Sequence, residues 1–157
     1  MSTNPTARHK AIDYLARREH SYLELFRKLL LKGYAQSEVE QALAELIDDN
    51  LLSDSRFAEA FVRSRVAKGH GPARIRMELK EKGLDDCQID QALEVNNIDW
   101  DSVIESVWLK KYSDSSSFVE IDKNRQWRFL QYRGFTHSQI SQLFRHIAQQ
   151  IENTEHS

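Results

Sequence analysis

The feature that most constrains this chain is a pattern that occurs three times, at a spacing of about fifty residues. In each copy a basic segment ends in Lys-Gly or Arg-Gly, a bulky apolar residue follows, and an acidic amphipathic segment begins. The glycines of the three copies are Gly33, Gly83 and Gly134. Self-similarity at a fixed period is typical of stacked supersecondary units. The sequence therefore predicts an array of small modules that binds a long object, rather than one globule around a single pocket.

The hydrophobic spacing is helical almost throughout the chain. Apolar residues recur at i, i+3, i+4, i+7 and i+8, which is the spacing of one buried stripe along an α-helix, and no segment alternates as a strand would. Four stripes are expected to be buried: Tyr22, Leu25, Phe26, Leu29 and Leu30; Val39, Ala42, Leu43, Leu46 and Ile47; Trp100, Val103, Ile104, Val107 and Trp108; and Ile140, Leu143, Phe144, Ile147 and Ile151. The predicted fold class is all-α.

Glycine and proline mark where helices end and begin. Gly33, Gly83 and Gly134 each follow a cation and precede a bulky apolar residue. That context predicts a glycine in the left-handed conformation just after a helix C-terminus. Pro72 follows Gly71 and suits the first position of a helix, where its missing N–H costs nothing.

These signals divide the chain into three tandem helix-turn-helix-like modules of three helices each. The modules are predicted at residues 7–50, 51–97 and 98–151, with a disordered N-terminus at 1–6 and a frayed C-terminus at 152–157. The expected helices are at 7–18, 21–32, 36–49, 54–68, 72–82, 86–95, 100–112, 122–133 and 137–151.

Composition excludes several classes of protein. A single cysteine, Cys87, allows neither an internal disulfide nor a cysteine-based zinc site, and we expect it to be a small packing residue. The histidines lack metal-binding spacing and no catalytic motif is present, so we expect no metal, no cofactor and no enzymatic activity. Without a membrane span or an export signal, the expected location is the cytoplasm. The serine-rich stretch at 113–117 is expected to be a flexible loop.

Charge alternates in step with the repeat, although the net charge is only -2. Residues 8–32 hold seven bases and three acids, and residues 33–55 hold six acids and no base. Residues 56–82 hold eight bases and three acids, and residues 83–105 hold seven acids and no base. Single charge runs are usually solvated faces, but recurrence in phase with the modules favours basic and acidic regions side by side.

The largest basic excess falls in the middle module. On the expected helical wheel Ile75 and Leu79 face the core, while Arg76 and Lys80 are neighbours on its flank. Solubility and intrahelical ion pairs are the alternative explanation for such cations. The candidates for contact with a partner protein or DNA are Arg56, Arg63, Arg65, Lys68, Arg74, Arg76, Lys80 and Lys82. Secondary candidates in the flanking modules are Arg27, Lys28, Lys32, Arg125, Arg128 and Arg133.

Three further features have competing interpretations. Arg65 shares a wheel face with apolar residues, where pairing with an acidic group is favoured over a role in binding. The Gly-His-Gly segment at 69–71 has glycines suited to an anion nest, but a helix-to-helix turn explains both of them. The aromatic and basic residues at 125–135 resemble those of single-strand binders, although at helical spacing some of the aromatics belong to the core.

The sequence resembles the RecX family of regulatory proteins. The similarity is strongest at residues 51–65 (LLSDSRFAEAFVRSR) and 69–83 (GHGPARIRMELKEKG). It continues at residues 29–34 (LLLKGY) and 128–135 (RFLQYRGF) and covers about residues 8–148. The joined central motif is long and specific.

Membership of this family would imply an elongated, curved molecule built of tandem three-helix modules. It would also imply binding to the RecA recombinase, in the groove of the RecA–single-stranded-DNA filament and across more than one protomer. Family members restrain filament growth, ATP hydrolysis and strand exchange in recombination and the SOS response, and some bind DNA by themselves. The basic residues of the middle module are then the best candidates for the contact, although the acidic helices suit basic RecA surfaces equally well. Many members are more basic around Tyr132, which weakens the case for a DNA contact in the third module.

Two alternatives stay open beside a monomeric RecA regulator. One is a stand-alone DNA-binding helical module, since three-helix units are also helix-turn-helix scaffolds. It predicts DNA affinity without RecA and a steep dependence on salt. The other is a plain helical scaffold, which predicts neither interaction.

Overall fold

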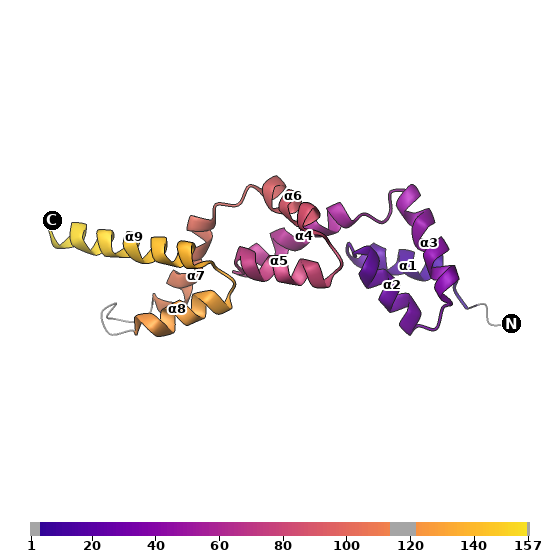
Figure 1. Ribbon diagram of the computed structural model, residues 1–157, viewed down its shortest axis with the longest axis horizontal. Coiled ribbons are helices and arrows are strands. Elements are labelled where there is room, and N and C mark those ends of the chain that lie inside the picture. The colour runs from indigo at the N-terminus through magenta and orange to yellow at the C-terminus, as the bar shows by residue number, and fades with distance from the viewer. Residues whose placement is uncertain (1–3, 114–121, 157) are drawn as a thin grey trace. The chain divides into compact units, whose positions relative to one another are not determined.

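The computed structural model describes residues 4–113 and 122–156. Every regular element within them is an α-helix, which confirms the all-α prediction (Figure 1). The helices of the described chain are α1 (Ala7–Arg17), α2 (Tyr22–Leu31), α3 (Gln36–Asp48), α4 (Asp54–Ala67), α5 (Pro72–Glu81), α6 (Asp86–Asn96), α7 (Trp100–Tyr112), α8 (Lys123–Tyr132) and α9 (His137–Glu155). Apart from Ser113, the loop predicted at 113–117 lies outside the described residues, as do residues 1–3 of the predicted N-terminal tail.

The helix boundaries follow the predicted ones closely, except at the end of α9. This helix continues to Glu155, past the predicted end at residue 151, because no glycine or proline interrupts residues 152–155. Among the described helices none is long and apolar enough to cross a membrane.

The described residues form two compact units. The first takes in the chain up to Val62 together with Glu78–Asn96, and the second takes in Arg63–Met77 together with the chain from Asn97 onward. Helices α4 and α5 each contribute residues to both units.

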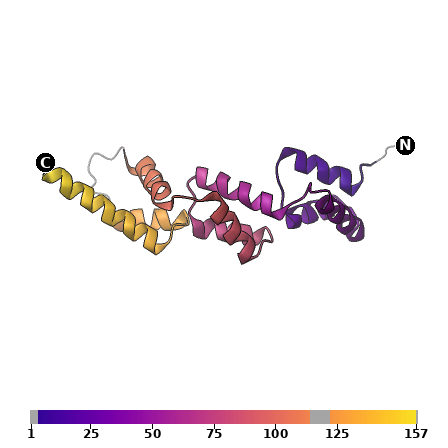
Figure 2. The same ribbon diagram turned by 90° about the horizontal axis from the view of Figure 1, so that it is seen from above.

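In the first unit, α1, α2 and α3 pack on one another (Figure 1, Figure 2). Leu30 and Ile47, which were expected in the buried stripes, are 37% and 48% exposed. Each lies about 100° further round its helix than the last buried leucine, Leu29 or Leu46, and so falls outside the contact face. The buried side chains of this core are Ala11, Leu25, Leu29, Val39, Leu43, Leu46 and Leu52.

In the second unit, α9 packs on α7 and α8. A buried polar pair lies within this core, where the indole Nε1–H of Trp108 donates to Oε1 of Gln126 at 2.7 Å. Ile151, the last residue of the predicted stripe on α9, is 42% exposed because the core ends before the helix does. The buried side chains of this core are Ile104, Trp108, Tyr112, Leu130, Phe135, Ile140 and Leu143.

The repeated glycines end their helices as predicted. Gly33, Gly83 and Gly134 have φ values of 98°, 92° and 102°. Each donates its N–H to the carbonyl three residues earlier, and the apolar residue after it donates to the carbonyl five residues earlier. This paired pattern satisfies carbonyls at the helix end and turns the apolar residue back onto the helix. Leu84 and Phe135, which follow two of the glycines, are accordingly buried.

The three glycines differ in their surroundings. A Cβ atom on Gly33 would meet nothing within 4 Å, whereas one on Gly83 would lie 2.9 Å from Cβ of Leu23, at the start of α2. A Cβ atom on Gly134 would clash with Cβ of Arg74, near the start of α5. Two of the three helix ends are therefore also close packing contacts.

Candidate functional site

A backbone contact in the second unit fixes the turn that carries several candidate cations. The N–H of Gly71 donates to the carbonyl of Arg133 at 2.8 Å, and the N–H of Ala73 donates to the carbonyl of Gly134 at 2.9 Å. These bonds join the start of α5 to the end of α8, and we call this contact the glycine junction. The turn predicted for residues 69–71 is present, with Gly69 at a φ of 84°. Gly71 is glycine for a different reason: the main chain of Gly134 comes so close that a side chain would not fit there.

Two arginines lie across the glycine junction. One guanidinium N–H of Arg133 donates to the carbonyl of Lys68 at 3.1 Å. The guanidinium of Arg74 lies over the ring of Tyr132, 5.5 Å from its centroid. Tyr132 is 78% exposed, so this cation–π pair is presented to solvent. The junction thus holds cations of α5 and α8 in defined positions.

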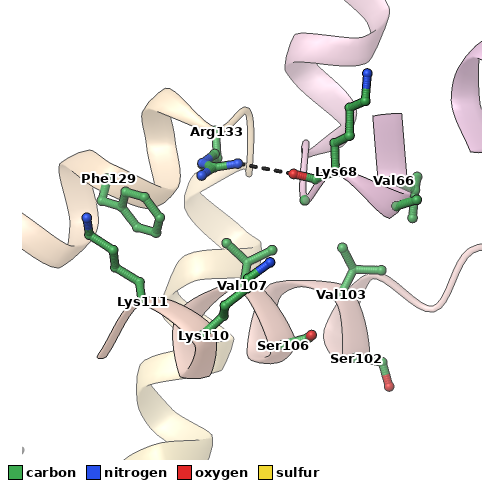
Figure 3. A pocket seen from close by; sticks show the side chains of 12 residues that line it. Val66, Lys68, Ser102, Val103, Ser106, Val107, Lys110, Lys111, Phe129 and Arg133 are labelled. Atoms are coloured by element: carbon green, nitrogen blue, oxygen red, sulfur yellow. Dashed lines mark hydrogen bonds between the residues drawn. The ribbon is translucent and has the colours of Figure 1, made fainter. Parts of the chain in front are cut away.

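Beside the junction lies a groove of about 640 Å³, formed by the end of α4, one face of α7 and part of α8 (Figure 3). Its cations are Lys68, Lys110, Lys111 and Arg133, and we call it the cationic groove. Figure 3 shows Val103 and Val107 of α7 pointing toward the end of α4, with Lys111 running alongside the ring of Phe129. The sequence interpretation missed Lys110 and Lys111, because a pair of lysines in the last turn of a helix also suits the helix dipole and gave no further signal.

In the first unit, Lys82 belongs to an ion-pair cluster around Glu24. The carboxylate of Glu24 accepts from Arg18 at 2.9 Å, from Lys82 at 3.3 Å and from the backbone N–H of Ser21 at 3.1 Å. Burial alone would raise the pKa of Glu24, but these hydrogen bonds and neighbouring cations lower it to about 2. Lys82 is therefore already engaged in an ion pair within the protein.

Two more candidates of the first unit are also held by internal partners. Arg56 donates to Oε1 of Glu19 at 3.1 Å, and to the side chain and the carbonyl of Asn50. Lys80 forms an ion pair with Asp86 at 3.1 Å. These contacts favour a structural role for the cations of the first unit.

Lys28, a secondary candidate, lies in a partly buried polar cluster. Its Nζ is 2.9 Å from Nε2 of His20 and 4.8 Å from the ring centroid of Tyr14. Burial lowers the pKa of His20, and it also lowers the pKa of Lys28. The neutral imidazole accepts from Lys28 through Nε2 and donates to the carbonyl of Arg18 through Nδ1.

The remaining candidates lie on helix surfaces of one unit or the other. Exposed members are Arg63 and Lys68 in the second unit, with the secondary candidates Arg27, Lys32, Arg125 and Arg128. Arg65, Arg74 and Arg76 are half-buried in the second unit. Ile75 and Leu79 are fully buried, as predicted from the helical wheel.

One sequence interpretation needs correction. Cys87, expected to be a packing residue, is exposed, because it lies in the first turn of α6 outside the buried face. Some of the aromatics considered for stacking belong to the core, as their helical spacing predicts: Phe135 is buried, and Trp127 and Phe129 pack against the core of the second unit. Tyr132 is the exposed member of that set.

Models of three-helix domains match the chain in tandem. The model described as the first three-helix domain of RecX matches residues 7–46, the second matches residues 53–93 and the third matches residues 99–144.

Curated relatives and solved structures agree with these matches. The regulatory protein RecX of Pseudomonas entomophila (strain L48) is 42% identical over 143 residues, which cover 91% of this chain and 92% of that protein. The regulatory protein RecX of Pseudomonas fluorescens (strain SBW25) is 43% identical with the same coverage. The crystal structure of RecX from Lactobacillus salivarius has a similar fold, with a TM-score of 0.71 at 23% identity over 90% of this chain and 94% of that one.

Proposed function

The chain belongs to the RecX family of regulatory proteins, and on this premise we propose that it binds the RecA recombinase and restrains its filament on single-stranded DNA. The proposed action is not enzymatic: a monomer in the cytoplasm, without a cofactor, lowers ATP hydrolysis by RecA, filament extension and strand exchange. Modules at 7–50, 51–97 and 98–151 would each offer a surface of their own, which suits contact with more than one RecA protomer.

The observation that carries this proposal is the fixed set of cations at the glycine junction. Exposed Arg63 and Lys68 precede the junction in α4 and the turn, and Arg74 and Arg76 follow it in α5. Two backbone hydrogen bonds hold this segment, so its cations meet an anionic partner with little loss of backbone freedom. We therefore propose that Arg63, Lys68, Arg74 and Arg76 contact RecA or its bound DNA.

Binding of this kind would regulate the RecA filament through the amount of protein bound to it, and not through catalysis. A protein that prefers one conformation of the filament shifts the filament toward it, and one that covers a filament end blocks addition of the next protomer. Charge complementarity also steers encounter with a polymeric target.

The test is single-stranded-DNA-dependent ATP hydrolysis by RecA, measured with increasing amounts of this protein. We expect hydrolysis to fall, well below one molecule per RecA protomer if filament ends are covered and near saturation if the groove is occupied. The double variant Arg74→Glu/Arg76→Glu should require about tenfold more protein for the same inhibition. The matched control Lys123→Glu/Arg145→Glu changes two exposed cations of α8 and α9 by the same charge and should inhibit like the wild type.

Two outcomes would contradict different parts of the proposal. Normal inhibition by a folded Arg74→Glu/Arg76→Glu variant would remove the contact from this segment and leave the regulatory function standing. No effect of the wild-type protein at any ratio would remove the regulatory function. Salt-sensitive DNA binding without RecA would then favour a stand-alone DNA-binding module.

A further inference from the structure

The cationic groove combines one sign of charge with an apolar floor. Lys110, Lys111 and Arg133 line it, and none of the described residues that line it is acidic. The half-buried side chains of Val103 and Val107 form part of its floor, with one side against the core and the other open to the groove. A groove of this kind is complementary to a ligand that carries both negative charge and aliphatic side chains.

The ring of Phe129 helps to decide which anionic ligand fits. The ammonium of Lys111 and the guanidinium of Arg133 both lie over this ring, 5.5 Å and 5.3 Å from its centroid. A nucleobase that stacked on Phe129 would compete with these cations for the ring, whereas a carboxylate would gain from both of them. The ring therefore favours recognition of carboxylates over stacking of bases.

The apolar floor favours a peptide ligand over a nucleic-acid backbone. Phosphates contact cations and N–H donors, and they gain nothing from valine side chains. A peptide that alternates acidic and aliphatic residues supplies both kinds of contact, since leucine-like side chains can pack on Val103 and Val107 while neighbouring carboxylates pair with the long side chains of Lys110 and Lys111. We propose that the cationic groove binds an extended acidic peptide segment that carries aliphatic side chains.

The proposal can be tested without RecA, so its failure is separate from failure of the regulatory function. The probe is a short fluorescein-labelled peptide in which glutamate alternates with leucine, and its binding to the full chain is followed by fluorescence anisotropy. An all-glutamate peptide of the same length tests the apolar floor, and an oligothymidylate of similar charge tests nucleic acid. We expect the glutamate–leucine peptide to bind at least about tenfold tighter than either comparison ligand.

Two variants locate the site. Lys110→Glu/Lys111→Glu reverses charge on α7, and Ser106→Glu places a carboxylate on the exposed face of the same helix within the groove. Each should weaken binding of the glutamate–leucine peptide by about tenfold or more. The matched controls are Lys123→Glu and Ser138→Glu, at exposed positions outside the groove, and they should stay within about twofold of the wild type. Thermal melts followed by tryptophan fluorescence identify any variant that has lost its fold.

Each other result would overturn the proposal. Equal affinity for the glutamate–leucine and all-glutamate peptides would show that the apolar floor takes no part. Tighter binding of oligothymidylate, lost in the same variants, would assign the groove to nucleic acid. Absence of peptide binding, or equal losses in the Ser106→Glu and Ser138→Glu variants, would leave no peptide site in the groove.

Discussion

Gly71 and Gly134 are in contact through their main chains, so closely that a Cβ atom on Gly71 would clash with the carbonyl group of Gly134. Gly71 does not take a left-handed φ, unlike Gly134. The lack of a side chain at Gly71 therefore serves the approach of two backbones and not a turn conformation. Because the hydrogen bond from Gly71 to the carbonyl of Arg133 depends on this approach, the glycine junction sets the position of α5 against α8.

The substitution Gly71→Ala should destabilise the second unit by about 2 kcal/mol or more, because the added methyl group overpacks a rigid backbone contact. All three tryptophans lie in this unit, so denaturant unfolding followed by tryptophan fluorescence reports on it. Gly33→Ala is the control, since its Cβ atom meets no neighbour and only the φ of 98° costs about 1 kcal/mol. Because Gly33 lies in the first unit, its substitution should shift the unfolding transition followed by circular dichroism. The transition followed by tryptophan fluorescence should stay in place. Equal shifts of the tryptophan transition would show that the junction tolerates a side chain.

The stability of the first unit should fall in acid because of Glu24. The folded-state pKa is about 2, below the ordinary value of 4.5, so the stabilisation is fully present above pH 4.5 and is lost as the pH falls toward 2. The loss should approach about 3 kcal/mol when Glu24 is protonated. Unfolding followed by circular dichroism at a series of pH values measures it, with Glu24→Gln as the comparison. A variant that keeps the same acid dependence would assign that dependence to other carboxylates.

At pH 6.5, the ordinary pKa of histidine, His20 should be mostly neutral, because burial lowers its pKa in the folded protein. Histidine-selective NMR titration measures this directly. Lys28→Met removes a nearby positive charge and should raise the pKa of His20 toward 6.5 without restoring it, since burial is the larger cause. An unchanged pKa in Lys28→Met would show that the ammonium does not act on the imidazole.

The substitution Tyr132→Ala tests whether the end of α8 takes part in binding to RecA or its DNA, with little effect on stability. Because Tyr132 is 78% exposed, its removal should change the free energy of unfolding by only about 0.5 kcal/mol. If the Arg74–Tyr132 pair contacts RecA or its DNA, inhibition of RecA ATP hydrolysis should weaken about tenfold. Phe129→Ala gives the contrast, since its ring packs against the core and its loss should cost about 3 kcal/mol. Full inhibition by Tyr132→Ala would exclude the ring from the contact.

The helices could be predicted because their signals are local. The 3.6-residue spacing of apolar side chains and the glycines after α2, α5 and α8 lie within a few residues of the boundaries that they define. Exposure of Leu30 and Ile47 could not be predicted in this way, because it depends on where neighbouring helices lie and not on the spacing itself.

The candidate site was harder to predict, because its contacts join residues far apart in the sequence. Arg56 and Glu19 are separated by 37 positions, and Lys82 and Glu24 by 58. The pattern of charge along the chain therefore could not show which cations of the middle module are already paired within the protein. The Gly71 contact was hidden for the same reason, since its neighbours Arg133 and Gly134 belong to another repeat.

The repeated glycine makes its close contacts with the preceding repeat. Gly83 meets Leu23 of the preceding repeat and Gly134 meets Arg74 of the preceding repeat, whereas Gly33, in the first repeat, meets nothing. The glycine at position 33 therefore serves only its left-handed φ, whereas at positions 83 and 134 it also admits a close neighbour. Substitution by a larger residue is accordingly limited by backbone conformation alone at Gly33, and by both conformation and packing at Gly83 and Gly134.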